Sequence, residues 1–136
     1  MSNATDNKAQ SERWFEDVWN QRRTACIFEM LLADAVGHLE HGDAVGPEPF
    51  AAVHAAFLAA FPDLKITVEG IVAEGDDVVV RWSATGMHRG EFLGVAATGK
   101  AVSFRGMTWH RYRDGKLFEG WDSWNVGGLM QHLKGE

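Results

Sequence analysis

The segment SFRGMTWHRYRDGKLFEGWDSWN, residues 103–125, decides the fold predicted for this chain. At its centre lies the pair Asp114 and Gly115. This pair is typical of a two-residue type I′ turn, because both central positions of that turn need a positive φ angle. Alternating, aromatic-rich runs flank the pair on both sides, and such alternation indicates strands. The segment is therefore expected to form a β-hairpin.

The register of this hairpin places one carboxylate among large apolar side chains. If the loop carries no bulge, Met107 faces Asp122, and Trp109 and Trp124 share the same face. A carboxylate in such surroundings loses hydration, so its pKa rises and it can exchange protons near neutral pH. The alternative role for Asp122 is a backbone cap or a salt bridge at the rim of the sheet. A β-bulge at Gly106 would shift the register and change the residues that face Asp122.

Length and composition limit the class of protein. A chain of 136 residues with 46% hydrophobic content fits one domain with a sizeable core. The net charge of −6, without a basic stripe, argues against nucleic acid and anionic membranes as partners. The lone Cys26 excludes an internal disulfide and fits a reducing compartment. No apolar run is long enough to span a bilayer, so we expect a cytoplasmic protein without a membrane partner.

The N-terminal part of the chain has helical periodicity. Residues 1–8 are polar and are expected to be disordered, whereas residues 9–136 are expected to form a single domain. Apolar residues at helical spacing predict a first amphipathic helix around residues 14–19. The same spacing predicts a second helix that reaches residues 31 and 32, with Thr24 as its cap.

A less regular segment and a third helix follow. Residues 35–46 are expected to be extended or looped, and they carry His38 and His41. Pro47 suits the first turn of a helix, and Pro62 ends the apolar stripe that follows it. The N-terminal half is therefore expected to supply three helices.

From Lys65 onward the hydrophobic period changes from helical to two. This change predicts strands over residues 65–73 and 78–88, with a glycine-containing loop over residues 89–100. A short helix is expected after the hairpin, around residues 126–133. Helices followed by antiparallel strands indicate an α+β fold, in which N-terminal helices cover one face of a strongly curved, mainly antiparallel sheet. Such a cone encloses a pocket at its open end.

Four segments give the chain a family resemblance. They are FPDL at 61–64, EGDDVVVRW at 74–82, ATGMHRGEFLG at 84–94 and DGKLFEGWDSWN at 114–125. Over roughly residues 12–133 the chain resembles the SnoaL-like polyketide cyclase, or ester cyclase, family of the NTF2-like superfamily. The resemblance implies an NTF2-like cone and a homodimer formed through the outer face of the sheet. Val79 and Thr85 are expected on that outer face.

The resemblance also implies an activity. Characterised members of the family close a ring of an aromatic polyketide by intramolecular aldol condensation, without metal or organic cofactor. They use an aspartate on the last strand as acid and base, and Asp122 occupies that motif position. The expected ligand is a small apolar or aromatic compound with a carbonyl group. The superfamily also contains ketosteroid isomerases, limonene-epoxide hydrolases and non-catalytic members, so enzymes of those kinds and a ligand-binding module remain alternatives.

Removal of a proton next to a carbonyl needs donors for the enolate oxygen, and histidines are the candidates. His88 matches a position where the family often has histidine and is expected on the face of Trp82, so it is assigned to catalysis with Asp122. His38 lies where family members carry a His-Asp-Pro sequence, although the residues after it differ. His110 points to the opposite face from Asp122 in the simple register. Both are retained as candidates for substrate binding.

The expected walls of the pocket are large and apolar, since flat rings suit a planar ligand. They are Trp82, Met107, Trp109 and Trp124. Core packing is the alternative role for each of them. No metal site is expected, because the spacing of His38 and His41 suits a helix and their segment is not predicted to be one. An epoxide hydrolase would need an arginine between two carboxylates, yet Arg81 alternates away from Trp82 and no second inward carboxylate is evident.

Overall fold

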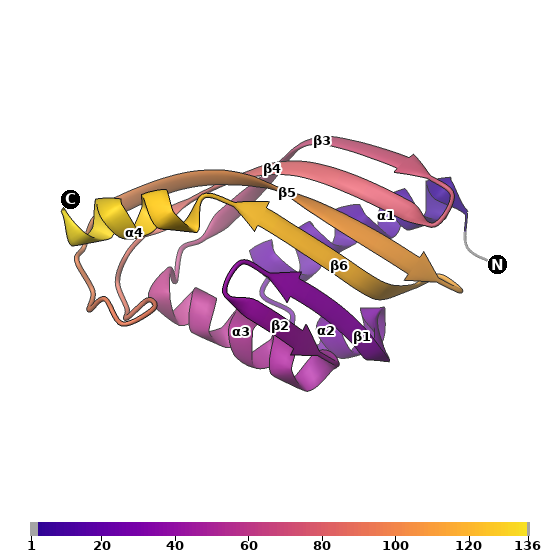
Figure 1. Cartoon of the computed structure of the whole chain (residues 1–136), viewed down its shortest axis with the longest axis horizontal. Helices are drawn as coiled ribbons and strands as arrows, with labels where there is room; N and C mark the ends of the chain where they lie inside the picture. Colours follow the sequence, from indigo (N-terminus) through magenta and orange to yellow (C-terminus); the bar gives the residue numbers. More distant parts are fainter. Residues whose placement is uncertain (1–2, 136) are drawn as a thin grey trace.

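The structure is a computed structural model that describes residues 3–135, and it confirms the predicted α+β fold. Its elements are α1 (Ala4–Arg13), the π-helix η1 (Trp14–Asn20), α2 (Thr24–Met30), β1 (Leu31–Leu39), β2 (Gly42–Val45), α3 (Pro47–Ala60), β3 (Lys65–Glu74), β4 (Asp77–Met87), β5 (Ala101–Arg113), β6 (Lys116–Trp124) and α4 (Val126–Lys134). The helices α1, α2 and α3 lie on one side of a curved, twisted sheet (Figure 1).

One mixed sheet organises the described residues. Its six strands follow the order β2-β1-β6-β5-β4-β3. Every neighbouring pair is antiparallel except β1 and β6, which run parallel. Because β2 and β3 are edge strands, the sheet is curved but not closed. The core lies between its inner face and the helices, where small-molecule sites commonly form.

Helical structure begins earlier than predicted. Helix α1 starts at Ala4, and the side chain of Asn3 caps it by accepting a hydrogen bond from a backbone N–H of the first turn. Asn7 is fully buried, and its Nδ2 donates to the carbonyl oxygen of Gly75 at 3.3 Å. These contacts tie the N-terminal turns to the β3–β4 connection. The first two residues of the chain lie outside the described residues.

The second helix is shorter than predicted. It ends at Met30, and Leu31 begins β1. Thr24 is the first helical residue and not the cap, because the cap position belongs to Arg23. Leu31 pairs with Leu117 on β6, so the chain becomes a strand at this residue. Hydrophobic periodicity alone does not reveal this pairing. The following segment, expected to be extended or looped, forms the hairpin of β1 and β2.

The hairpin of β5 and β6 turns at the predicted pair but carries a bulge elsewhere. Tyr112 pairs with Leu117, whereas the next pair joins Arg111 to Glu119 and leaves Phe118 without a partner. Tyr112 and Leu117 are buried in the core, while Phe118 packs on the outer face, and the bulge turns the rest of β6 over. The predicted simple register was therefore wrong.

This single extra residue changes which side chains face Asp122. Thr108 pairs with Asp122, and Trp109 pairs with Trp121. Since a slip of one residue moves a strand's side chains to the opposite face, Met107 and Trp109 lie on the outer face. They are 50% and 45% exposed, respectively. The predicted pairing of Met107 with Asp122, and the shared face of Trp109 and Asp122, are corrected by this register.

Candidate functional site

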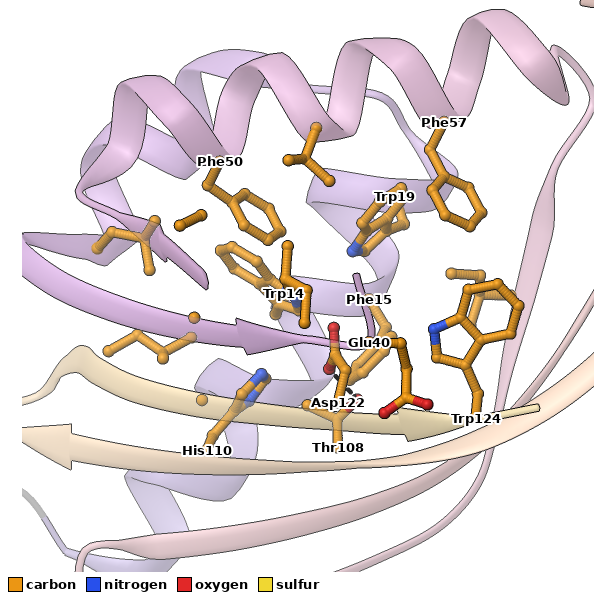
Figure 2. A pocket seen from close by; sticks show the side chains of 18 of the residues that line it. Trp14, Phe15, Trp19, Glu40, Phe50, Phe57, Thr108, His110, Asp122 and Trp124 are labelled. Atoms are coloured by element: carbon orange, nitrogen blue, oxygen red, sulfur yellow. Dashed lines mark hydrogen bonds between the residues drawn. The ribbon is translucent and has the colours of Figure 1, made fainter. Parts of the chain in front are cut away.

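A cavity of about 100 Å³ lies between the inner face of the sheet and the helices (Figure 2). Eight of the residues that line it are Trp or Phe: Trp14, Phe15, Trp19, Phe50, Phe57, Trp82, Phe104 and Trp124. The polar side chains that join them are Glu40, His41, Thr108, His110 and Asp122. Among the described residues no lysine or arginine lines the cavity. Any charge that forms in this cavity is therefore poorly solvated and lacks a fixed positive partner.

Asp122 is held by a directional chain of hydrogen bonds on the floor of the cavity. Trp82 Nε1 can only donate, and it lies 2.9 Å from Thr108 Oγ1. Thr108 in turn donates its hydroxyl proton to Asp122 Oδ1 at 2.8 Å. This chain exists because Thr108 and Asp122 are opposite each other on β5 and β6. In the described part of the chain Oδ2 of Asp122 makes no hydrogen bond, which leaves it available to a ligand.

The surroundings of Asp122 favour its protonated form. Burial raises the pKa of Asp122 to about 6, while the hydrogen bond from Thr108 opposes this effect and the nearby Glu40 carboxylate adds to it. Glu40 belongs to the connection between β1 and β2 and reaches toward Asp122 (Figure 2). At neutral pH Asp122 is thus mostly ionised, yet it is a much better proton acceptor than an exposed aspartate.

His110 faces the cavity, contrary to the simple register. It lies two residues along β5 from Thr108, on the same inner face. Its Nδ1 is 2.9 Å from the Ser11 hydroxyl of α1, and Ser11 Oγ is 2.7 Å from the hydroxyl of Tyr112. Burial lowers the pKa of His110 to about 3, so the imidazole is neutral at physiological pH.

His88 and His38 do not reach the cavity. His88 is fully buried at the end of β4, where its Nδ1 lies 2.9 Å from Thr98 Oγ1 and its ring packs on Phe61. His38 lies on the outer face, with Nε2 at 2.7 Å from a carboxylate oxygen of Glu119. Its ring stacks on Trp121, its cross-strand partner on β6. The hydrogen bond to Glu119 raises the pKa of His38.

Of the residues selected from the sequence, the structure therefore brings together Asp122, His110, Trp82 and Trp124. It places His38, His88, Met107 and Trp109 outside the cavity lining. Sequence reasoning missed Thr108 and Glu40. Alternation along β5 could have found Thr108 had the bulge been known, but no local pattern marks Glu40 as a residue that faces inward. Glu40 also corrects the expectation that the pocket holds no second carboxylate.

Comparison with known proteins assigns the chain to a family. Its sequence matches the family described as SnoaL-like polyketide cyclase over residues 9–133. The chain belongs to this family. Comparison with curated proteins gives no match. The family match covers every element that contributes to the cavity.

Solved structures of similar fold support the membership. A protein from Jannaschia sp. CCS1, provisionally assigned as a SnoaL-like polyketide cyclase, superimposes with a TM-score of 0.92 at 26% identity, covering 98% of this chain and 94% of that one. AclR from Streptomyces galilaeus, provisionally assigned as a hydroxylase, gives a TM-score of 0.86 at 31% identity, with 98% and 84% covered. IdmH from Streptomyces antibioticus, provisionally assigned as a polyketide cyclase, gives 0.80 at 29% identity, with 96% and 99% covered.

Two ionisable groups with shifted pKa values share the cavity of this SnoaL-like protein. Asp122 is a proton acceptor of raised pKa, His110 is a neutral imidazole, and apolar side chains surround both. Across residues 3–135 no group of three or more His, Cys, Asp or Glu side chains is arranged to hold a metal ion. No helix in the same range is both long and apolar enough to cross a membrane.

Proposed function

We propose that this SnoaL-like protein is an acid/base enzyme that works without a cofactor. It removes a proton from carbon next to a carbonyl group, and aldol-type cyclisation of a polyketide-like substrate is the leading reaction. The observation that supports the proposal is the position of Asp122, an ionisable carboxylate of raised pKa in an aromatic cavity with one oxygen free. Carbon acids need a base whose pKa is close to the working pH.

The proposed reaction returns the proton that it takes. Asp122 Oδ2 accepts a proton from the carbon, and the electron pair of the broken C–H bond forms an enolate. The enolate carbon then attacks a second carbonyl of the same molecule, which forms a C–C bond and an alkoxide. Asp122 returns its proton to the alkoxide oxygen, so acid and base are one residue. Thr108 keeps the carboxyl group oriented through both steps by its hydrogen bond to Oδ1.

The test uses acetylacetone, a small neutral compound with a C–H bond between two carbonyls. Wild-type protein should accelerate deuterium exchange at this carbon, measured by NMR against the spontaneous rate. Asp122→Asn should lower the enzymatic rate by about 10²- to 10⁴-fold, the usual contribution of a positioned acid or base. His38→Ala, on the outer face, serves as the matched control and should exchange like wild type.

Full exchange activity in Asp122→Asn would remove the acid/base role of this residue. Saturable binding of acetylacetone with no enzymatic exchange would instead favour the alternative of a ligand-binding module. That alternative has one observation in its favour, since the apolar lining of the cavity would hold a ligand without any reaction.

We also propose that the protein forms a homodimer through the outer face of the sheet. Three large apolar side chains stand exposed there: Val72, Met107 and Trp109. Val79 lies between Val72 and Trp109 in the ladder of β3, β4 and β5, which makes the apolar surface continuous. A contiguous exposed apolar patch with a polar rim is a common feature of protein interfaces.

A further inference from the structure

We propose that His110 is a second catalytic residue, which donates the proton on its Nε2 in a hydrogen bond to the carbonyl oxygen of the substrate. As Asp122 removes the neighbouring proton, this oxygen becomes an enolate oxygen and the hydrogen bond strengthens. Ser11 and Tyr112 are positioning residues that keep the proton on Nε2. The inference rests on the proposed function and deepens it, because it assigns the second half of the catalytic pair.

The direction of the buried hydrogen bonds assigns the proton of His110. Tyr112 is 2% exposed, and within the described chain the only hydrogen-bond partner of its hydroxyl is Ser11 Oγ. If Tyr112 donates to Ser11, then Ser11 donates to Nδ1 of His110, and every hydroxyl proton has an acceptor. The opposite direction leaves the Tyr112 proton buried without an acceptor, which costs about 1–3 kcal/mol. If Ser11 instead accepted from both neighbours, its own proton would have no acceptor among the described residues, at a similar cost. Nδ1 therefore accepts, and the single proton of a neutral imidazole lies on Nε2.

The protonation states of Tyr112 and His110, the two ends of this hydrogen-bond chain, support this direction. Burial raises the pKa of the Tyr112 hydroxyl, so it stays protonated and can donate at any physiological pH. Burial keeps His110 neutral, so its ring carries one N–H and not two. The imidazole ring also packs against Trp14 and Phe15, with centroid distances of 5.9 and 6.0 Å, and these contacts restrict its orientation.

The spacing of His110 and Asp122 suits a carbonyl compound. His110 pairs with Gly120 and Asp122 pairs with Thr108, so the two functional residues are diagonal neighbours across β5 and β6. Diagonal neighbours lie about 7–8 Å apart. Two side chains that stand on one face at this spacing can contact the oxygen and the adjacent carbon of the same carbonyl compound. Gly120 carries no side chain in the space between them.

The other cavity donors are less well placed. The hydroxyl of Thr108 is committed to Asp122, and the indole N–H of Trp82 is committed to Thr108. The rings of Trp19 and Trp124 stand on the other side of Asp122 from His110 in Figure 2. The indole N–H groups of Trp19 and Trp124, together with that of Trp14, which lines the cavity beside His110, are the competitors that an experiment must separate from His110.

The first experiment measures the tautomer of His110 in the wild-type protein by ¹⁵N NMR, which needs no turnover. We expect the Nε2–H form, with a shift of the Nε2 resonance when acetylacetone binds. Ser11→Ala should increase the Nδ1–H form, and Ser11→Thr should restore the wild-type tautomer because it keeps the hydroxyl. Observation of the Nδ1–H form in wild type, or no response of Nε2 to acetylacetone, overturns the proposal.

The second experiment measures deuterium exchange in variants that remove one donor each. His110→Phe should lower kcat by about 10²- to 10³-fold, the usual cost of one oxyanion donor, with a small change in KM. Ser11→Ala should lower kcat and Ser11→Thr should recover it. A wild-type kcat in His110→Phe, or an equal loss in Trp14→Phe, Trp19→Phe or Trp124→Phe, overturns the assignment. If wild type shows no exchange, the proposed function fails, and the response of Nε2 to acetylacetone still decides whether His110 is the donor.

Discussion

At Asp122, ionisation and folding oppose each other. An aspartate has a pKa of about 3.9 in an unfolded chain, whereas burial raises the pKa of Asp122 to about 6 in the folded protein. The folded state therefore binds its proton more tightly than the unfolded state does. This contribution to stability is fully present below pH about 4 and is lost as the pH rises through about 6. The ionised carboxylate that the proposed proton abstraction needs is thus the less stable form of the folded protein.

Asp122→Asn should therefore stabilise the protein at pH 7.5. Asparagine has nearly the same shape and no charge to desolvate, so the free energy of unfolding should rise by about 1–3 kcal/mol, on the basis of 1.36 kcal/mol for each pKa unit. Urea unfolding at pH 7.5 and pH 4 measures the effect, which should nearly vanish at pH 4. Destabilisation of Asp122→Asn at pH 7.5 would show that the carboxylate has a structural partner.

Thr108 sets the pKa of Asp122 as well as its orientation. Its hydroxyl stabilises the carboxylate, so Thr108→Val should raise the pKa of Asp122 above its value of about 6. Since the base must be ionised, kcat/KM should increase with pH through this pKa, and the midpoint of the profile should move to higher pH in the variant. Thr108→Ser keeps the hydroxyl and should keep the wild-type midpoint. Thr108→Val also leaves Trp82 Nε1 without its acceptor, which should cost about 1–3 kcal/mol of stability.

At the level of elements, η1 and α3 determine how large a ligand can be. Trp19 of η1 packs edge-on against Phe50, His54 and Phe57 of α3, with centroid distances of 6.3, 4.8 and 5.8 Å. These ring contacts fill the space between η1 and α3 and leave a cavity of about 100 Å³. An apolar cavity of about 150 Å³ is known to bind benzene. The cavity therefore has room for about one ring of a substrate.

Trp19→Ala should widen the specificity of the site. Removal of the indole enlarges the cavity and should favour the larger compound, benzoylacetone, over acetylacetone. The ratio of their kcat/KM values should rise about tenfold or more, which is the size of effect that a change in an apolar pocket can produce. Exchange assays with both compounds give this ratio, with Trp19→Phe as the matched control that keeps an aromatic ring. The substitution should also cost about 3–5 kcal/mol of stability, the usual value for a large aromatic residue in a core. An unchanged ratio would mean that other residues limit ligand size.

At the level of the whole molecule, one sheet separates two kinds of surface. Its inner face holds the cavity with Asp122 and His110, and its outer face carries the exposed Met107 and Trp109. Adjacent residues on β5 point to opposite faces. A substitution can therefore affect the proposed reaction without affecting the proposed dimer, and the reverse. Substitutions on the outer face should alter association and leave deuterium exchange intact.

Light scattering at micromolar concentration should give about twice the chain mass of 15.1 kDa. Met107→Glu places a charge in the apolar part of the proposed interface, so this variant should behave as a monomer at the same concentration. Its exchange activity with acetylacetone, per folded chain, should stay near that of wild type. A wild-type mass of a single chain would contradict the proposed dimer.

The sequence by itself determined the order and type of most elements, the turn at Asp114 and Gly115, and Asp122 as the residue of interest. Those features depend on local signals: hydrophobic periodicity, proline and glycine positions, and a motif shared with a family. Only the tertiary structure decided that Thr108 and His110, and not Met107 and Trp109, face the cavity with Asp122. The bulge at Phe118 reverses those faces, because it lets Leu117 and Asp122, which simple alternation would put on opposite faces of β6, both line the cavity.

The parallel pairing of β1 with β6 could not be predicted from the sequence either. It joins residues about 80 positions apart, as with His38 and Trp121, and so depends on packing that no local window contains. The same pairing fixes His38 on the outer face and lets the connection after β1 carry Glu40 to the cavity. Local propensity is set within a few residues, whereas a site at the centre of a curved sheet is set by register across strands, where a shift of one residue reverses every side chain.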